Sequence, residues 1–271
     1  MAFGTTKIMK YILVTGAYGG MGREAVRWLR DKGFFVFALD KRICDAEHNI
    51  LPIEADITSE ESVIAAMNIV SAHTDSLYAI LHFAGLYMLD SLVEMRDEAF
   101  CRIFDVNVHG AFLVNKIFFP LLKKGSRILI TTSELAPLDP LPFTGIYAVT
   151  KAALDKYAYS LRMELQLLDI KVSVLRAGAV ETGMLGVSTD ALDRFCEKTE
   201  LYSCNADRFQ RIVNRVEARC IPPAKIAKKA AKILETPSPK FAYSINRNPL
   251  LLLLNAMPKR FQLWVIKTIL R

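Results

Sequence analysis

The feature that most constrains the fold is a regular alternation of short apolar runs with amphipathic segments of helical length. The runs are rich in β-branched and aromatic residues and almost continuously apolar, as expected of strands covered on both faces of a sheet. They span residues 10–16, 34–40, 49–55, 77–85, 126–133 and 171–178. Helical patterns fill the connections at residues 20–32, 59–74, 97–121 and 147–168. This alternation predicts parallel βαβ units with right-handed crossovers, hence an α/β fold with one doubly wound parallel sheet.

The pattern changes after Gly178. Residues 183–221 are polar and compatible with helices, and an insertion of this length favours a lid or substrate loop. A last strand is predicted at residues 241–245. Because no repeat or linker interrupts the chain, we expect a single domain over residues 1–271, which ends in an apolar and basic tail at residues 249–271.

Composition bears on the cellular location of the protein and on whether it binds nucleic acid or metal. Five cysteines without a C-x-x-C pair, and no separate apolar leader before the first strand, favour reduced thiols and a cytoplasmic location. The net charge is +7, but six basic and no acidic residues lie between Thr236 and Arg271. Because the body carries no basic stripe with aromatic platforms, no nucleic-acid partner is expected. The four histidines form no metal-ligand set, so no metal is expected, and His82 is interpreted as a packed residue at a strand end.

The first strand runs into the sequence TGAYGGMG, in which Gly16, Gly20 and Gly22 lie where the chain must turn tightly into a helix. Glycine tolerates positive φ and lets backbone N–H groups approach a pyrophosphate at the positive end of the helix. The position of this turn, between a strand and a helix near the N-terminus, favours a dinucleotide site over an ordinary turn.

The second strand ends in Asp40, where a carboxylate can accept hydrogen bonds from ribose hydroxyls and would repel a 2′-phosphate. This favours NAD. Lys41 and Arg42 follow at once and keep NADP possible, although the glycine turn itself contains no basic residue. Asp56, after the third strand, is placed to meet the adenine edge, and an ordinary loop aspartate would give the same pattern.

Taken in order, the motifs resemble the short-chain dehydrogenase/reductase family over nearly the whole chain. The matching segments are TGAYGGMG, Asp56, HFAG at 82–85, DVNVHG around Asn107, TTSELA around Ser133, YAVTK at 147–151 and RAGAVET at 176–182. The resemblance implies a single doubly wound domain of the Rossmann type that binds NAD(P) and moves hydride between an alcohol carbon and nicotinamide.

The segment YAVTK carries the chemistry that the resemblance implies. Tyr147 and Lys151 lie one helical turn apart on the same face. A free tyrosine has a pKa of about 10, and a nearby ammonium favours its phenolate. By the resemblance, Tyr147 is the general acid/base, and Lys151 also binds the nicotinamide ribose.

Two further residues complete the expected catalytic set. Ser133 would hydrogen-bond the substrate oxygen, and Asn107 matches the residue that orders a water near the lysine. In most family members the serine precedes the tyrosine by about thirteen residues, whereas here the separation is fourteen, so Glu134 is the strict match. We favour Ser133, because the proline-rich loop that follows it can absorb one extra residue.

The resemblance also assigns the cofactor contacts. HFAG replaces the usual NNAG, but Ala84 and Gly85, which let the cofactor approach, are retained. Ala177-Gly178 replaces the usual Pro-Gly, and Thr182 keeps the position that contacts the carboxamide. The expected cofactor-binding set is Gly16, Tyr18, Gly19, Gly20, Met21, Gly22, Asp40, Asp56, Ile57, Ala84, Gly85, Tyr147, Lys151, Gly178, Val180 and Thr182.

The lid and tail bear on the substrate. Met184 and Leu185, at the start of the lid, favour a lipophilic alcohol or ketone, or simply anchor the lid. The last helix of the tail presents one apolar and one basic face, which suits either a membrane interface or docking on the body. These faces contain Phe261, Trp264, Val265 and Ile269, and Arg260, Lys267 and Arg271, respectively.

The ending resembles family members that act on steroids, retinoids or sphingoid lipids, so an NAD(P)-dependent oxidoreductase for a hydrophobic secondary alcohol or ketone is the leading hypothesis. Reduction of 3-oxoacyl or small carbonyl substrates and a catalytically silent dinucleotide-binding regulator are the alternatives. The resemblance further implies a homo-oligomer formed through the helices at residues 97–121 and 147–168.

Overall fold

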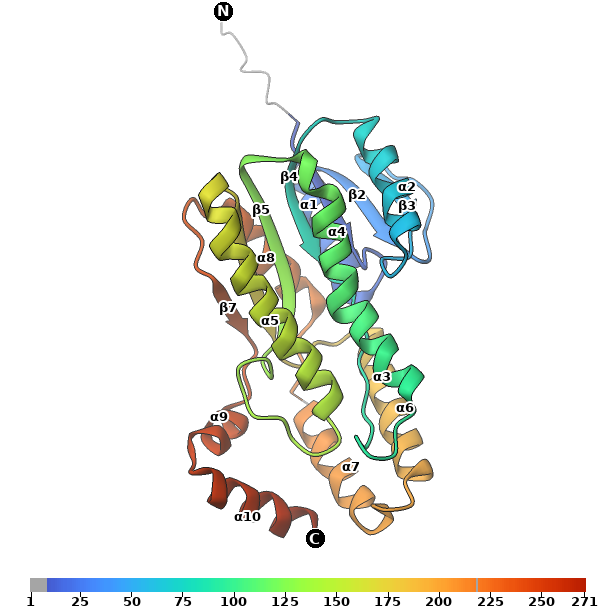
Figure 1. The fold of residues 1–271 in the computed structure, drawn as a ribbon, viewed down its shortest axis with the longest axis vertical. Coiled ribbons are helices and arrows are strands. Elements are labelled where there is room, and N and C mark those ends of the chain that lie inside the picture. Colours follow the sequence, from blue (N-terminus) through green and yellow to red (C-terminus); the bar gives the residue numbers. More distant parts are fainter. Residues whose placement is uncertain (1–8, 218) are drawn as a thin grey trace, which may run out of the picture.

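A computed structural model describes residues 9–217 and 219–271, apart from the side chains of residues 183–190 and 214–217. Its centre is one parallel sheet in the order β3-β2-β1-β4-β5-β6-β7 (Figure 1). The strands are β1 (Tyr11–Thr15), β2 (Phe35–Asp40), β3 (Ile50–Glu54), β4 (Leu77–His82), β5 (Leu122–Ser133), β6 (Lys171–Ala177) and β7 (Ala242–Ile245). Each predicted strand is present, and the doubly wound α/β fold is confirmed.

Helices cover both faces of the sheet (Figure 1). In β1, Ile12 and Val14 pack in the layer of α1 and α8, whereas Leu13 packs in the layer of α2, α4 and α5. Because successive strand residues face opposite layers, both of which are apolar, the strand sequence is apolar throughout. The five helices are α1 (Gly20–Asp31), α8 (Pro223–Glu235), α2 (Glu60–Ser71), α4 (Gly110–Phe118) and α5 (Gly145–Leu165).

The strand order reverses between β1 and β4, and this places the chemistry of the chain. Thr15 at the end of β1 pairs with Leu39 of β2 on one side and with His82 of β4 on the other. The chain leaves β1 toward β2 and leaves β4 toward β5, in opposite directions along the sheet, and this opens a crevice at the carboxyl ends of β1 and β4. The glycine turn after β1, Asp40 at the end of β2 and Ala84-Gly85 after β4 all lie at this crevice.

The helix expected at residues 97–121 is interrupted, so that boundary is corrected. It comprises α3 (Asp97–Phe104), a π-helical turn η1 (Asp105–His109), α4, and a 3₁₀ turn η2 (Phe119–Leu121). Single π turns within helices occur often at functional sites. Here the wider turn contains Asn107, whose side chain is only 1% exposed. A second 3₁₀ turn, η3 (Gln166–Leu168), ends α5.

The segments predicted as lid and tail lie below the sheet in Figure 1. α6 (Gly183–Lys198) and α7 (Ser203–Glu217) occupy the segment predicted to be a lid, and α9 (Pro249–Ala256) and α10 (Lys259–Leu270) occupy the tail. Phe143 joins the lid to the body, because its ring lies 4.5 Å from that of Phe195 and 5.0 Å from that of Phe209. The side chains of Met184 and Leu185, on which the lid-hinge prediction rests, lie outside the described residues.

The tail contacts the body while leaving apolar side chains outside. The Asn205 amide donates to the Leu270 carbonyl at 2.6 Å, and Lys259 forms an ion pair with Asp139. Trp264 is nevertheless 60% exposed, and other apolar residues of α10 are similarly open: Phe261, Leu263 and Ile269. Across residues 9–217 and 219–271, no helix has the length and hydropathy needed to span a bilayer.

Candidate active site

The glycine turn is held by close packing against two other segments of the chain. Gly16 adopts φ 66°, and a Cβ there would lie 2.5 Å from the Ala84 nitrogen. A Cβ at Gly22 would lie 2.0 Å from the Gly16 oxygen, and one at Gly20 would lie 2.5 Å from the Thr182 Cβ. Only glycine fits these positions. The N-cap of α1 is Gly19, so the helix begins without a side-chain cap. The exposed N–H groups of that helix end form a cradle suited to an anion.

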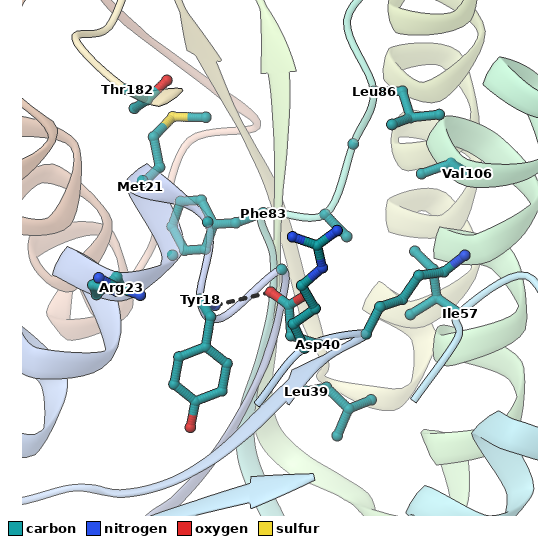
Figure 2. A pocket seen from close by; sticks show the side chains of 18 of the residues that line it. Tyr18, Met21, Arg23, Leu39, Asp40, Ile57, Phe83, Leu86, Val106 and Thr182 are labelled. Carbon is teal, nitrogen blue, oxygen red and sulfur yellow. Dashed lines mark hydrogen bonds between the residues drawn. The ribbon is translucent and has the colours of Figure 1, made fainter. Parts of the chain in front are cut away.

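This turn borders a cavity of about 720 Å³, which we call the glycine-turn cavity (Figure 2). It gathers most of the predicted cofactor set: Gly16, Tyr18, Gly19, Gly20, Met21, Gly22, Asp40, Ile57, Ala84, Gly85 and Thr182. Asp56 is not among its lining residues, because the Asp56 carboxylate binds the Lys41 ammonium at 2.7 Å and the Thr58 backbone at 2.9 Å. Burial raises the pKa of Asp56, but the contacts with Lys41 and Thr58 outweigh this effect, so the pKa is lowered overall.

Asp40 lies on the wall of this cavity with its carboxylate directed at the turn. The Tyr18 backbone N–H donates to the Asp40 Oδ2 at 2.9 Å, as the dashed line in Figure 2 shows. Sequence reasoning missed several other lining residues, of which three are basic or apolar neighbours of known motifs: Arg23, Phe83 and Leu86. Because Arg23 directly follows Gly22, its position at the cavity could have been predicted from the glycine turn. The position of Arg102, which comes from α3, could not.

The Ser133 hydroxyl, at the end of β5, lies beside the phenol of Tyr147, which comes from α5, and accepts the Leu135 N–H at 3.2 Å. Burial raises the pKa of Tyr147, the neighbouring Tyr87 raises it further, and the Ser133 side chain opposes both effects. The Tyr87 and Tyr147 ring centroids lie 4.8 Å apart. The phenol therefore carries its proton at neutral pH, and a cation beside it favours the anion.

Lys151 lies one turn further along α5 and is 5% exposed. Its ammonium is 5.6 Å from the Tyr147 ring centroid and donates to the Thr131 carbonyl at 3.4 Å. Burial lowers the pKa of Lys151 to about 8. Gly85 leaves the ammonium accessible, because a Cβ at that residue would lie 3.3 Å from the Lys151 Nζ.

Asn107 connects this helix to the segment after β4. Its Oδ1 accepts from the Leu86 N–H at 2.7 Å, and its Nδ2 donates to the Leu86 carbonyl at 3.0 Å and to the Thr150 hydroxyl at 3.0 Å. All these bonds hold the strand-end segment beside Lys151. The structure thus brings together Asn107, Ser133, Tyr147 and Lys151, the complete predicted catalytic set.

The two candidates for the serine position face different partners. Ser133 contacts Tyr147, whereas the neighbouring Glu134 carboxylate accepts the Asn248 N–H at 2.6 Å. The loop after them packs on the tail, since the Asp139 N–H donates to the Asn255 side chain at 2.7 Å. This geometry fits the choice of Ser133 over the strict spacing match.

Ser133 and Tyr147 open onto a second cavity of about 190 Å³, the tyrosine cavity. Gly178 and Val180, predicted as cofactor contacts, line this cavity rather than the glycine-turn cavity, and Met21, Tyr87 and Thr182 line both. Its remaining wall is mainly apolar and comes from the loop after β5, the lid and the tail: Leu135, Leu141, Phe209, Ile212, Val213 and Leu251. None of these six was identified from the sequence, because nothing in the pattern locates a lid or tail helix over a strand end.

His82 is a packed residue, as predicted. It is 4% exposed, and its Nε2 lies 2.9 Å from the Asn115 Oδ1, whose amide donates to the Tyr157 hydroxyl at 3.1 Å. Burial lowers the pKa of His82 to about 4, against which the Asn115 contact acts only weakly. The ring is therefore neutral at pH 7 and joins β4 to α4 and α5.

Comparison with known proteins identifies the family of this chain. A family model described as short chain dehydrogenase matches residues 10–193. Estradiol 17-beta-dehydrogenase 2 of Mus musculus is 33% identical over 199 residues, which cover 68% of this chain and 51% of that protein, so the chain spans about half the length of that relative. The 3-ketodihydrosphingosine reductase of Bacteroides thetaiotaomicron is 23% identical over 92% of this chain and 91% of its own length.

Solved structures show the same fold. A short chain dehydrogenase from Burkholderia cenocepacia in complex with NADP has a TM-score of 0.73 and 21% identity, with 95% of this chain and 96% of that chain covered. A 3-ketoacyl-(acyl-carrier-protein) reductase from Brucella melitensis complexed with NADH has a TM-score of 0.71 and 22% identity, with 87% and 96% covered. With the family model matching from β1 into α6, the chain belongs to the short chain dehydrogenase family.

Proposed function

We propose that this family member is an NAD(P)-dependent oxidoreductase that interconverts a hydrophobic secondary alcohol and its ketone. The observation that carries the proposal is that Ser133 and Tyr147 line the tyrosine cavity together, beside Tyr87, which lines both this cavity and the glycine-turn cavity. A cofactor in the first cavity and a substrate in the second would then meet beside a proton donor.

The glycine-turn cavity fits a nicotinamide dinucleotide. The three glycines that admit no Cβ let backbone approach a pyrophosphate at the start of α1. Asp40 can accept hydrogen bonds from the hydroxyls of the adenosine ribose, which favours NAD. Arg23 and Arg42 line the same cavity and could bind the 2′-phosphate of NADP, which is therefore the alternative cofactor. When bound, the cofactor supplies the acceptor or donor of hydride.

The chain's own groups then handle the proton and the substrate oxygen. Ser133 donates to that oxygen and holds it near Tyr147, which gives its phenolic proton in ketone reduction and recovers it in alcohol oxidation. The Lys151 ammonium is the cation that favours the phenolate, and with a pKa of about 8 it is largely protonated at neutral pH. Asn107 keeps the segment around Leu86 in register with Lys151.

The substrate class is inferred from the apolar wall of the tyrosine cavity. Phe209 and Leu251, from the lid and the tail, belong to that wall, and the polar residues of the cavity include Thr132, Ser133, Glu134, Thr144, Tyr147 and Thr182. Relatives named for estradiol and 3-ketodihydrosphingosine support a steroid or other lipid-like alcohol, and the neighbour named for 3-ketoacyl groups makes a 3-oxoacyl or small carbonyl substrate the second candidate. The alternative of a catalytically silent regulator is less favoured, because the four predicted catalytic residues lie close together.

A change at Tyr147 tests the function. Tyr147→Phe should reduce turnover of a secondary alcohol by about a thousandfold, since general acid–base catalysis contributes roughly 10² to 10⁴-fold. Nicotinamide absorbance measures turnover, and quenching of protein fluorescence measures cofactor binding, which should persist. Tyr159→Phe, on the same helix but 50% exposed, is the matched control. Equal activity of the two variants would refute the role of Tyr147.

We also propose that the outward side of α10 meets an anionic lipid surface. Leu263 and Trp264 are 67% and 60% exposed, and Arg260, Lys267 and Arg271 are exposed on the same short helix. Apolar insertion combined with basic side chains is typical of interfacial helices. Pelleting with anionic vesicles should be lost in Leu263→Ser/Trp264→Ser and retained in Leu167→Ser, an exposed residue at the end of α5. Equal pelleting of both variants would exclude this face.

A homo-oligomer is proposed through α4 and α5. Several of their apolar side chains are open to solvent: Phe112, Val149 and Met163, together with Phe119 in η2. Exposed apolar patches of this kind mark protein–protein contacts. Light scattering after size exclusion should give a dimer or larger assembly, which Phe112→Glu dissociates. A monomeric mass for the unmodified chain would contradict the proposal.

A further inference from the structure

Glu134 is an acidic residue inside an otherwise uncharged cavity. It follows Ser133 directly, is 8% exposed and lines the tyrosine cavity. Its backbone is fixed, because the Glu134 N–H donates to the Ala177 carbonyl at 2.9 Å and so continues the pairing of β5 with β6. No Lys, Arg, His or Asp occurs among the described residues that line this cavity.

The two carboxylate oxygens of Glu134 differ in their surroundings. Oε2 accepts the Asn248 N–H at 2.6 Å, at the start of α9. Oε1 lies over Gly178, 3.0 Å from the place that a Cβ on Gly178 would occupy. Within the described part of the chain, the hydrogen bonds of this carboxylate are limited to the one from Asn248. The charge of Arg247 acts on it only from an exposed side chain.

A buried carboxylate with one hydrogen bond lowers the stability of the folded protein. Burial raises the pKa of Glu134, and the Asn248 hydrogen bond and Arg247 only partly oppose this. A buried charge is costly unless a second charged or donor group approaches it. Glutamine or leucine would fill the same space without this cost, so the carboxylate calls for a partner that enters the cavity.

Resting on the proposed function, we infer that Glu134 determines substrate specificity by binding an amino group carried on the carbon next to the reacting carbon. Ser133 and Glu134 are consecutive and line the same cavity. A substrate whose oxygen is held by Ser133 and Tyr147 therefore presents its neighbouring substituent toward Glu134. An ammonium there forms a charge-assisted hydrogen bond to Oε1, while a carboxylate or phosphate in that position is repelled.

Three secondary alcohols of equal size and a fourth with two more heavy atoms test this inference. All share a hexyl arm, and the other arm is an aminomethyl, hydroxymethyl, ethyl or carboxymethyl group. With the unmodified protein, kcat/KM should fall in that order, and the aminomethyl alcohol should exceed the ethyl alcohol by about tenfold or more, as expected for one hydrogen bond to a charged group.

Glu134→Gln removes the charge but keeps an oxygen that can accept the Asn248 N–H, so the fold and the position of α9 are preserved. This variant should lose the preference for the aminomethyl alcohol by about tenfold and keep kcat/KM for the ethyl alcohol within about twofold, since one charge-assisted contact is removed. Glu181→Gln, an exposed glutamate on the loop before α6, is the charge control and should change neither value.

The outcomes separate the inference from the proposed function. If the ethyl alcohol is oxidised and Glu134→Gln leaves the preference for the aminomethyl alcohol unchanged, the specificity role of Glu134 is overturned. If none of the four alcohols is oxidised, the proposed function fails for this substrate class. In that case, calorimetric titration of NADH-loaded protein with the aminomethyl and ethyl alcohols measures whether Glu134 strengthens binding of the amine. Equal Kd values for the two alcohols would overturn the specificity role of Glu134.

Discussion

The two cavities are built in different ways. The glycine-turn cavity is lined by the glycine turn, by residues at and after the ends of neighbouring parallel strands, and by Arg102 and Val106, all within residues 16–106 apart from Thr182. The tyrosine cavity starts from strand ends too, but much of its apolar wall is supplied by α7 and α9, which lie more than fifty residues from Tyr147 along the chain. The first cavity depends on which residues the sheet requires, and the second on how distant helices pack.

This difference predicts where substitutions act. Changes at the strand ends, apart from Glu134, should alter catalysis, stability or cofactor binding, whatever the substrate. Changes in the wall from α7 and α9 should alter only the response to substrate size. The four predictions below test this division, from the largest expected effect to the smallest.

Ser133→Ala should lower kcat by about a hundredfold, because the substrate oxygen loses a fixed donor of the kind whose removal costs roughly 10² to 10³ in kcat. Cofactor Kd should not change. Ser133→Thr, which restores a hydroxyl, should recover part of the activity. The same assay on Glu134→Gln with the ethyl alcohol distinguishes the two possible serine positions: a loss there as large as in Ser133→Ala would assign the catalytic position to residue 134.

His82→Asn should remove a pH dependence of stability. In the folded protein His82 has a pKa of about 4, below its ordinary value of 6.5, so the unfolded chain binds the extra proton between these values. The resulting stability is complete above pH 6.5 and is lost as the pH falls toward 4. Over this window the unfolding free energy should fall by about 3 kcal/mol more in the unmodified protein than in the variant. Urea unfolding at several pH values measures the two slopes, and parallel slopes would contradict the buried neutral ring.

Asp40→Ala should weaken NAD binding by about tenfold, since a hydrogen bond to a charged group is removed. NADP binding should change little or improve, because the repulsion of a 2′-phosphate disappears. Titration by protein fluorescence gives both Kd values, with Asp45→Ala, an exposed aspartate five residues on, as control. Equal losses for NAD and NADP would show that Asp40 acts by holding the Tyr18 N–H rather than by contacting the ribose.

The sheet and most of the catalytic set were predictable because their causes are local. An apolar run followed by Gly16, or a tyrosine one helical turn from Lys151, depends on neighbours in sequence. The π turn at Asn107 was not predicted, and the hydrogen bonds of that side chain to Leu86 join segments 21 residues apart, which a local pattern does not show. Asp56 fits the motif, yet Lys41 engages it in the structure, and this pairing depends on side-chain packing that the motif does not encode.

Leu251→Ala is the smallest expected change and the most direct test of the division between the cavities. Leu251 is 9% exposed and lines the tyrosine cavity from α9, whereas Leu253, two residues on, is 58% exposed. Removing the Leu251 side chain takes apolar contact from the hexyl arm, so KM for the ethyl alcohol should rise about fivefold, in line with roughly 1 kcal/mol for part of a buried leucine contact. Neither NAD binding nor kcat should change, and Leu253→Ala should resemble the unmodified protein. If Leu251→Ala instead weakened NAD binding, the tail would support the cofactor cavity as well, and the two cavities would not be separable.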